Sequence, residues 1–300
     1  MGCAQGSRHE INYVAETVFG TTPASPAFSA FRNTGTTLEL SKTAITSSEL
    51  RSDRQISDFL GGNRQVGGDI GIELSADSFD DMIEAALGGT WAADILKAGT
   101  VSRSFTVERL FDDITRYLRY TGMVVSGFSL SVQPDAMVTG SFTFVGKDQE
   151  TDTVIVMGAT YGEKTTTSPF DSFSGTISEG GAAIATVTGL DISLDNGAEA
   201  SFVIGDATTP CITLANSNLT GTLTAQFNDS ALLAKFIDET ETSLEFSLTD
   251  GTSTQTFLLP RIKYTGGSVP VSDDGLVTIS LPFQALLDST EGTNIKITRS

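Results

Sequence analysis

The side chains that most often carry enzyme chemistry are scarce in this chain of 300 residues. His9 is the only histidine, and it lies in a polar N-terminal stretch without periodic hydrophobicity. A Ser-His-Asp or Cys-His arrangement would have to be built on this least constrained part of the chain. The only cysteines, Cys3 and Cys211, are too few for a disulfide scaffold or a metal cluster, and they fit a reducing compartment. Catalysis by an activated nucleophile is therefore not expected.

Two pairs of adjacent carboxylates, Asp80-Asp81 and Asp112-Asp113, are candidates for an acid/base pair or a calcium site. Adjacent residues of a helix do not face each other, and EF-hand spacing is absent, so a hydrated helix start and a turn are expected instead. The glycine-rich stretch GGNRQVGG (Gly61–Gly68) precedes a predicted strand, whereas a phosphate-binding loop precedes a helix. We expect no enzyme activity, no cofactor and no metal.

The chain is strongly acidic, with 37 Asp and Glu against 18 Lys and Arg and a net charge of −19. Tight wrapping by nucleic acid is disfavoured, because neutralising phosphates requires clustered Lys and Arg. The acidity either serves solubility or repels an anionic molecule that passes nearby. The mean hydropathy of +0.03 and short apolar runs predict a globular chain without a membrane-spanning or targeting segment.

Strand signals dominate the chain: short segments rich in Val, Ile, Thr and Phe alternate with Gly, Asp, Asn and Ser turns. Helical spacing occurs twice, each time after a predicted strand. The first stripe is Phe79, Met82, Ile83, Ala86 and Leu87, and the second is Leu232, Leu233, Phe236 and Ile237. A mainly β fold with two short α-helices is therefore predicted.

The two helical stretches belong to a longer internal sequence repeat. At a constant offset of 153 residues, five apolar residues of the first half align in order with five of the second half. The first five are Ile70, Ile72, Leu74, Phe79 and Ile83, and the second five are Leu223, Ala225, Phe227, Leu232 and Phe236. LRYTG (118–122) echoes IKYTG (262–266), DAMVTGSFTF (135–144) echoes DGLVTISLPF (274–283), and TLEL (37–40) echoes DISL (191–194). Chance similarity between two β domains is the alternative to a duplicated domain of about 120 residues.

The duplication predicts four parts of the chain. They are an N-terminal arm at 1–35, a first domain at 36–150, a linker at 151–175 and a second domain at 176–300.

Within the predicted strands, one side is apolar and the other is small, hydroxylic or acidic, as in an antiparallel sheet with one packed and one hydrated face. The acidic residues of the hydrated side are Glu39, Glu73, Glu108, Asp191 and Glu245. Arg119, Arg261 and Lys263 interrupt this pattern, and either an outer sheet or a subunit contact explains them.

Several segments together resemble one family. They are LRSDRQISDFLGGNRQVGGDIGIELSADSFDDMIEAALGGTW, SFTVERLF, YLRYTGMVVSGFSLSVQPDAMVTGSFTFVGKD and LDISLDNG with LTGTLTAQFNDSALLAKFIDETETSLEFSL. Over about residues 10–300 the chain is similar to the major tail tube proteins of long, non-contractile (siphovirus) bacteriophage tails. The resemblance implies two tandem β-sandwich or barrel tube domains, each with a flanking helix, in stacked rings whose inner sheets form one barrel. Relatives with one tube domain form six-membered rings, so a chain with two is expected to close as a homotrimer.

The resemblance also assigns roles to residues of this chain. It implies that the five acidic residues of the hydrated side line the lumen and repel DNA. It assigns ring-to-ring contact to the predicted loop Thr43–Gly68, through Arg51, Asp53, Arg54, Asp58, Phe59, Leu60 and Arg64. The matching loop of the second half, Asp195–Leu219, is almost free of basic residues and is expected to contact a different partner.

The implied partners are further copies of the chain, the tape measure protein and then genomic DNA in the lumen without specific binding, and the tail terminator and tail tip proteins. No membrane partner is expected. The implied location is the virion tail, assembled in the bacterial host cytoplasm. A tail terminator, another tube component of an injection machine, and a β-sandwich surface adhesin remain as alternatives.

Overall fold

The computed structural model describes residues 3–172, 174–184, 186–271 and 274–300. The predicted mainly β fold is confirmed, with two short α-helices among many strands. In the first half the elements are β1 (His9–Ala15), β2 (Ala27–Phe31), β3 (Gly35–Thr36), β4 (Glu39–Thr46), β5 (Phe59–Glu73), α1 (Asp80–Leu87), β6 (Ile95–Lys97), β7 (Phe105–Phe111), β8 (Arg116–Val132), β9 (Thr139–Gly146), β10 (Asp148–Asp152) and β11 (Thr160–Tyr161). In the second half they are β12 (Thr176–Glu179), β13 (Ala182–Ala183), β14 (Val187–Asp195), β15 (Glu199–Ser201), β16 (Cys211–Thr213), β17 (Asn218–Gln226), α2 (Ala231–Ile237), β18 (Thr242–Thr249), β19 (Thr254–Tyr264), β20 (Thr278–Ala285) and β21 (Lys296–Arg299).

Helix α1 forms where the apolar stripe predicts it. Asp80 and Asp81 lie in its first turn, where negative charge favours the helix dipole, and Gly88 ends the helix with a left-handed φ of 61°. Its apolar stripe is buried, with Met82 and Ile83 at 0% and 1% exposure. Helix α2 is more peripheral, because its apolar residues only partly bury themselves against the core.

The order in which strands pair is the same in the two halves. The first half pairs β4, β5, β9, β8 and β7 in that order, and the second pairs β14, β17, β20, β19 and β18, all antiparallel. The register repeats as well: Ile70 pairs with Phe142, and their counterparts Leu223 and Leu281 pair with each other. The echo at an offset of 153 residues is therefore present in the strand pairing.

One part of the sequence echo does not hold. Tyr264 of IKYTG pairs with Phe283, whose counterpart in the first half is Phe144. Phe144 pairs with Val125 and not with Tyr120 of LRYTG. The two similar pentapeptides thus lie five residues out of structural correspondence, because pairing with β9 and β20 fixes the register and the local sequence does not.

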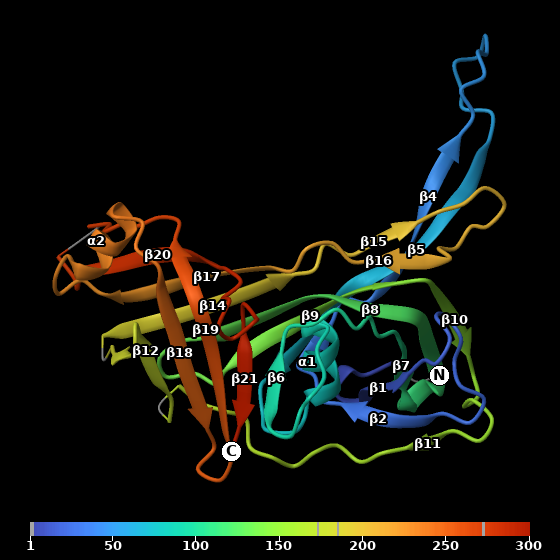
Figure 1. Cartoon of the computed structure of the whole chain (residues 1–300). Coiled ribbons are helices and arrows are strands. Elements are labelled where there is room, and N and C mark those ends of the chain that lie inside the picture. The colour runs from blue at the N-terminus through green and yellow to red at the C-terminus, as the bar shows by residue number, and fades with distance from the viewer. Residues whose placement is uncertain (1–2, 173, 185, 272–273) are drawn as a thin grey trace.

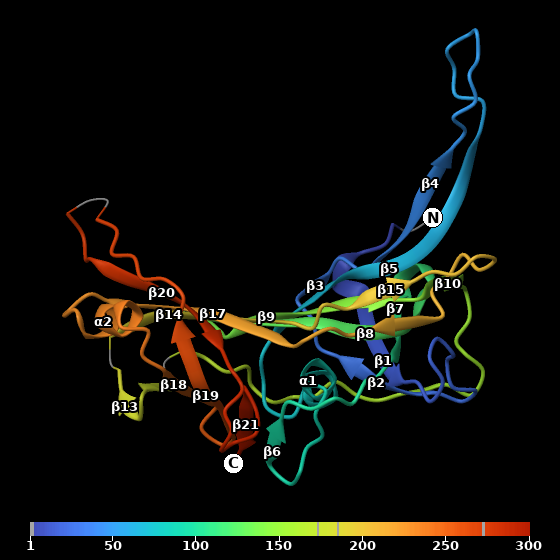
Figure 2. The same cartoon turned by 45° about the horizontal axis from the view of Figure 1, so that its top comes forward.

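Strands β8 and β19 are long enough to belong to two layers. The first part of β8 pairs with β7 and β10, whereas its last part pairs with β9 and β14. Likewise β19 pairs first with β18 and β21 and then with β20. We call the layer formed by β4, β5, β9, the last part of β8, β14, β17 and β20 the long sheet. Figure 2 shows α1, β1 and β2 on one side of it.

The two halves are joined into one sheet at the pairing of β8 with β14. Gly127–Val132 of the first half runs antiparallel to Leu190–Asp195 of the second, with Phe128 opposite Leu194. One continuous cluster of buried apolar side chains extends through both halves. The two halves therefore share one hydrophobic core and are joined by direct strand pairing.

The N-terminal stretch is part of the fold and not a separate arm. Strand β1 pairs with both β2 and β7, and Ile11 and Phe31 are buried in the core. The stretch predicted as a linker also packs on the first half, since β11 pairs with β2 and Phe170 is fully buried. Sequence reasoning missed the pairings of β1 with β7 and of β2 with β11 because these partners lie about 100 residues or more away in the chain.

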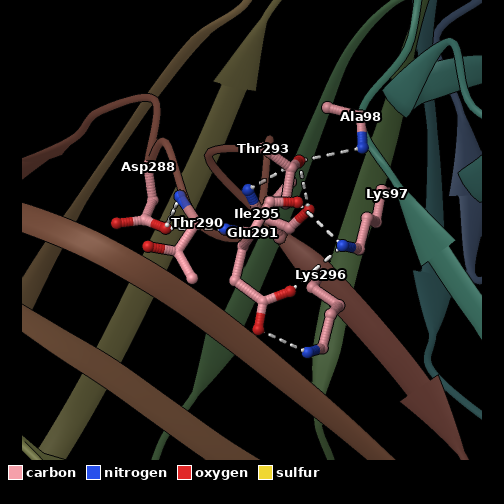
Figure 3. Close-up of polar contacts among 8 residues, drawn as sticks. All are labelled: Lys97, Ala98, Asp288, Thr290, Glu291, Thr293, Ile295 and Lys296. Atoms are coloured by element: carbon pink, nitrogen blue, oxygen red, sulfur yellow. Dashed lines mark hydrogen bonds and ion pairs between the residues drawn. The ribbon is translucent and has the colours of Figure 1, made fainter.

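A second tie connects the halves through β6 and β21, which pair with each other. Figure 3 shows Glu291 between two lysines: Lys97 Nζ donates to its backbone oxygen at 2.7 Å, and Lys296 Nζ donates to its Oε1 at 2.8 Å. The pKa of Glu291 is lowered by the hydrogen bond from Lys296 and by a further one from Lys97 Nζ to the carboxylate Oε2 at 3.1 Å. Beside them, Ala98 N donates to Thr293 Oγ1 at 3.1 Å.

Candidate functional site

The candidate functional site is the side of the long sheet that faces away from the core, which we call the polar face. Side chains alternate along each strand, so that Ile70, Phe142, Leu130, Ile192 and Leu281 are buried while their neighbours point the other way. These neighbours are Glu39, Ser41, Asp69, Glu73, Ser129, Ser131, Thr139, Ser141, Thr143, Asp191, Ser193, Asp195, Thr220, Thr222, Thr224, Ser280 and Gln284. The polar face thus combines hydroxyl groups with five carboxylates.

Basic residues are absent from these described positions of the polar face. Lys263, which pairs with Gln284 of β20, lies at the border of the polar face, at the end of β19. Its ammonium group lies 3.7 Å from Glu241, which also binds Arg261 at 2.7 Å. The polar face is therefore bordered, but not occupied, by positive charge.

The polar face is hollowed at the junction of the two halves. A groove of about 730 Å³ is lined from β8, β9, β14, β17 and β20, including Ser129, Asp191 and Thr222. Hydrogen bonds link its strands: Ser131 Oγ donates to Asp191 Oδ1 at 2.6 Å, and the hydroxyls of Ser129 and Ser141 lie 2.9 Å apart. Farther along, Thr143 Oγ1 donates to Asp69 Oδ1 at 2.5 Å.

Three of the five predicted acidic residues lie on the polar face and are exposed: Glu39, Glu73 and Asp191. Glu245 is exposed but lies on β18, which runs away from the long sheet together with the first part of β19 (Figure 1). Glu108 lies on β7 in the other layer and is 0% exposed. The prediction of a hydrated position is therefore wrong for Glu108, and Glu245 does not share the polar face. Alternation tells which side of a strand is polar, but not which layer the strand joins.

The buried Glu108 belongs to an ion-pair cluster that also places Arg119. Arg119 Nε donates to Glu108 Oε2 at 2.7 Å, and its Nη1 donates to Asp152 Oδ2 at 3.1 Å. Tyr161 donates its hydroxyl proton to Glu108 Oε1 at 2.7 Å, and burial together with that carboxylate raises the pKa of Tyr161. These contacts tie β7, β8 and β10 to the stretch that leads to the second half.

The predicted stacking segment Thr43–Gly68 is mostly a β-hairpin and not a loop. Strands β4 and β5 pair from Glu39 to Thr46, and Figure 1 shows the hairpin projecting from the body of the molecule. Its tip holds the predicted residues Arg51, Asp53, Arg54 and Asp58, whereas Phe59, Leu60 and Arg64 lie in β5. The prediction of a loop is wrong here, because turn-forming residues at the tip gave no sign of the regular strand pairing on both sides of it.

The side chains of this hairpin differ in what they contact within the chain. Arg51 and Asp53 bind each other at 2.7 Å, and Arg64 binds Asp148 of β10 at 2.7 Å. Five apolar side chains of the hairpin are exposed, by between 57% and 99%: Ile45, Leu50, Ile56, Phe59 and Leu60. The apolar residues are thus the part of the hairpin that the single chain leaves uncovered.

The corresponding connection of the second half is built differently. It forms the small hairpin β15–β16, which lies beside β5 of the first half (Figure 1). Arg64 N donates to Ala207 O at 2.7 Å across this contact. The second connection therefore rests on its own chain, while the β4–β5 hairpin extends away from it.

Two acidic residues of the polar face, Asp69 and Asp195, escaped the sequence-based selection. The signal for Asp69 was present, since Val66, Ile70 and Ile72 are buried and place it on the same side as Glu73. Asp195 follows from the same alternation after Leu194.

Neither a metal centre nor a membrane-spanning helix occurs in the described part of the chain. Groups of three or more His, Cys, Asp or Glu with the geometry to hold a metal ion are absent from these residues. None of their helices is long and apolar enough to cross a membrane.

Comparison with known proteins agrees with this architecture. No curated protein matches the chain. A family model described as phage tail tube protein matches residues 6–285, which is most of the chain and includes both halves of the long sheet. The chain therefore belongs to the phage tail tube protein family.

Proposed function

We propose that three copies of this chain close into a ring, and that stacked rings form the tail tube through which genomic DNA leaves a long, non-contractile phage tail. The observation that carries the proposal is the polar face, a carboxylate- and hydroxyl-lined sheet surface that spans both halves without a Lys or Arg among its described positions. Membership in the tail tube family makes the protein a structural component of the phage tail.

The repeated pairing order supports three copies per ring. Each half gives four strands to the long sheet or its end, namely β4, β5, β9 and β8 in the first and β14, β17, β20 and β19 in the second. Three copies then give about 24 strands, which at ~4.8 Å spacing and a tilt of ~40° form a barrel roughly 48 Å across. Side chains narrow the bore to about 35–40 Å, and duplex DNA, on the order of 20 Å wide, passes freely.

The negative charge of the polar face would keep DNA from adhering to the wall of the bore. Glu39, Asp69, Glu73, Asp191 and Asp195 would face the phosphates of the passing duplex without cations between them. Like charges repel at these distances, and low-dielectric walls focus the field, so DNA does not adhere to the wall. The same surface tolerates the tape measure protein that occupies the lumen before the genome.

The β4–β5 hairpin supports contact between successive rings. Its exposed apolar side chains, among them Leu50, Phe59 and Leu60, require a cover that the single chain does not supply. We assign this cover to the adjacent ring, with the charged tip residues Arg51, Asp53, Arg54 and Asp58 around it. The last rings at the two ends of the tube would contact the tail terminator and tail tip proteins, and assembly would take place in the host cytoplasm.

The proposal is tested by electron microscopy of the purified full-length protein in negative stain. We expect tubes with a regular axial repeat. Single rings that never stack would favour a tail terminator, and monomers alone at high concentration would contradict the proposal. A Phe59→Ser/Leu60→Ser variant should give rings without tubes, while Val18→Ser, which removes an apolar side chain that is 63% exposed elsewhere, should still give tubes.

A further inference from the structure

We infer the strand register of the seam between neighbouring copies: β4 of one copy pairs antiparallel with Thr265–Val271 of the next, with Glu39 opposite Ser268 and Leu40 opposite Gly267 of the second copy. The inference rests on the proposed ring, and it names the interface that closes that ring. Its basis is the junction between the two halves of one chain, which serves as a template for the junction between chains.

The template is the pairing of β8 with β14. There the first half ends its part of the long sheet at Gly127–Val132, and the second half begins its part at β14. Phe128 lies opposite Leu194, and Ser129 lies opposite Ser193. If the halves repeat around a closed barrel, every second junction is this one and the others lie between chains.

Both segments needed for the second kind of junction, the strand β4 and the segment that follows β19, have an unpaired edge. Among the described strands, β4 pairs only with β5, so its other edge has no strand beside it. The segment after β19 follows β20 on one side, where Ser268 and Ser280 exchange two backbone hydrogen bonds of 3.0 and 2.9 Å. No described strand pairs with its other side. Such edges readily accept a further strand.

The register follows from pairs that repeat in the two halves. Ser268 opposite Ser280 repeats Ser129 opposite Ser141, so the segment around Ser268 corresponds to the end of β8. Leu40 opposite Val66 repeats Leu194 opposite Leu219, so β4 corresponds to β14. When each residue of the template pairs is replaced by its counterpart in the other half, Leu40 comes opposite Gly267 and Glu39 comes opposite Ser268.

The backbone directions on both edges agree with this register. Thr37 N donates to Asp69 O at 2.9 Å, so alternate residues of β4 point toward β5 and the backbone groups of Leu40 and Lys42 point outward. Ser268 points toward β20, so Gly267 and Val269 point outward. Neither edge has to be turned for its backbone groups to meet those of the other.

Two further backbone details locate the hydrogen bonds of the seam. In the template, Asn196 N donates to Ser126 O at 2.8 Å, and the corresponding seam bond is from Lys42 N to Thr265 O. The Leu38 carbonyl already accepts from Arg109 Nη1 at 2.9 Å and from the Tyr120 hydroxyl at 3.2 Å. The seam is therefore held chiefly at Leu40 and Lys42.

The side chains fit as well. On the polar face, Glu39 and Ser41 come beside Ser268 and Gly266, so the seam adds no cation to the bore. On the core side, Leu40 and Val269 are only partly buried against the apolar cluster of the single chain, and the seam would cover both. The small Gly267 stands where the template has Phe128, and a Cβ there would lie 2.9 Å from Leu233, so α2 fills this space.

Cysteine pairs test the register in the full-length protein, with the exposed native cysteines replaced as Cys3→Ser and Cys211→Ser. Non-hydrogen-bonded pairs in antiparallel sheets have Cα atoms about 4.5 Å apart, within reach of a disulfide. The matched set is Glu39→Cys or Ser41→Cys combined with Ser268→Cys or Gly266→Cys. In the inferred register, Glu39 with Ser268 and Ser41 with Gly266 should cross-link copies into dimers and closed trimers on non-reducing gels. The two crossed combinations, slipped by two residues, should stay monomeric.

An intrachain pair controls for folding and oxidation: Ser129→Cys with Ser193→Cys should form a disulfide without dimers, because these residues face each other within one chain. Electron microscopy of the reduced variants separates the two levels of the proposal. Rings that cross-link only through the crossed combinations, or through none while the intrachain control oxidises, overturn the register and leave the tube function standing. Absence of rings and tubes from both the native chain and the cysteine-free protein refutes the ring itself.

Discussion

Gly221 lies opposite Phe283 on β17 and β20, so close that a Cβ atom on Gly221 would come within 2.4 Å of the phenyl ring. A glycine-phenylalanine pair recurs in the first half, where Gly68 lies opposite Phe144, although the atoms nearest to a Cβ on Gly68 are backbone atoms of Thr37 and Leu38. In both halves the glycine also approaches a backbone oxygen, that of Asp191 at 2.5 Å or Thr37 at 2.6 Å from the Cβ position. Along with the strand order, the repeat thus preserves a glycine that a neighbouring backbone approaches closely.

The first prediction concerns this contact. Gly221→Ala forces the phenyl ring of Phe283 out of its site in the core, and overpacking of this kind lowers the free energy of unfolding by about 1–3 kcal/mol. Urea denaturation followed by circular dichroism measures the change. Gly61→Ala is the matched control, since a Cβ there meets nothing within 4 Å. Equal stability of the two variants would contradict the prediction.

The second prediction concerns the buried ion pair of Glu108 and Arg119, whose side chains are 0% and 7% exposed. Glu108→Gln leaves the buried guanidinium charge with only the exposed Asp152 as an anionic partner, which costs about 3–5 kcal/mol of folding free energy. The matched control is Glu241→Gln, which breaks the exposed pair with Arg261 and should leave the unfolding midpoint almost unchanged. A small effect at Glu108 would show that water reaches the cluster.

The third prediction concerns pH. Burial, with Arg109 and Lys164 nearby, lowers the pKa of His9 from 6.5 to about 4. Arg109 Nε donates to His9 Nε2 at 3.0 Å, a bond that requires the unprotonated ring. The unfolded chain therefore takes up a proton below about pH 6.5 while the folded chain does not until about pH 4, and stability falls across this interval.

The measurement is the free energy of unfolding at several pH values between 7 and 4 for the native chain and for His9→Gln, which keeps a hydrogen-bond acceptor. The difference between the two proteins should change steadily over this interval, in the sense that the native chain loses more stability on acidification. Parallel pH profiles would show that His9 titrates normally.

The fourth prediction concerns the charge of the bore. Tubes of Asp191→Lys should bind short duplex DNA at about 50 mM salt and release it at about 200 mM, because phosphate contacts release counterions. Tubes of the native chain should not bind it. Glu245→Lys makes the same change of charge on β18, away from the polar face, and serves as the control in a co-sedimentation assay. Equal retention of DNA by both variants would show that Asp191 does not face the bore.

Much of the fold is encoded in local patterns that the sequence reveals. The stripe around Met82 and Ile83 predicts α1, and the alternation in DAMVTGSFTF and DGLVTISLPF predicts β9 and β20 as well as their equivalence. These predictions succeed because the period of hydrophobicity follows from the geometry of a single element.

The errors have a common physical origin in pairing between distant segments. Glu108 and Asp191 alternate with apolar neighbours in the same way, yet β7 joins one layer and β14 the other, and only the partner strands decide between them. The sequence likewise could not show that Phe59 continues a hairpin strand, or that Ile11 is buried against distant strands. The site was therefore predictable in composition, but only partly in its members.

The central claim is that the polar face lines a closed bore made from three copies. A cryo-electron microscopy reconstruction of the assembled tube, processed without imposed symmetry, tests it most directly. We expect three copies per ring, with Glu73, Asp191 and Asp195 projecting into the lumen and each β4–β5 hairpin in contact with the next ring. Six copies per ring, or a polar face turned to the outside of the tube, would contradict the account.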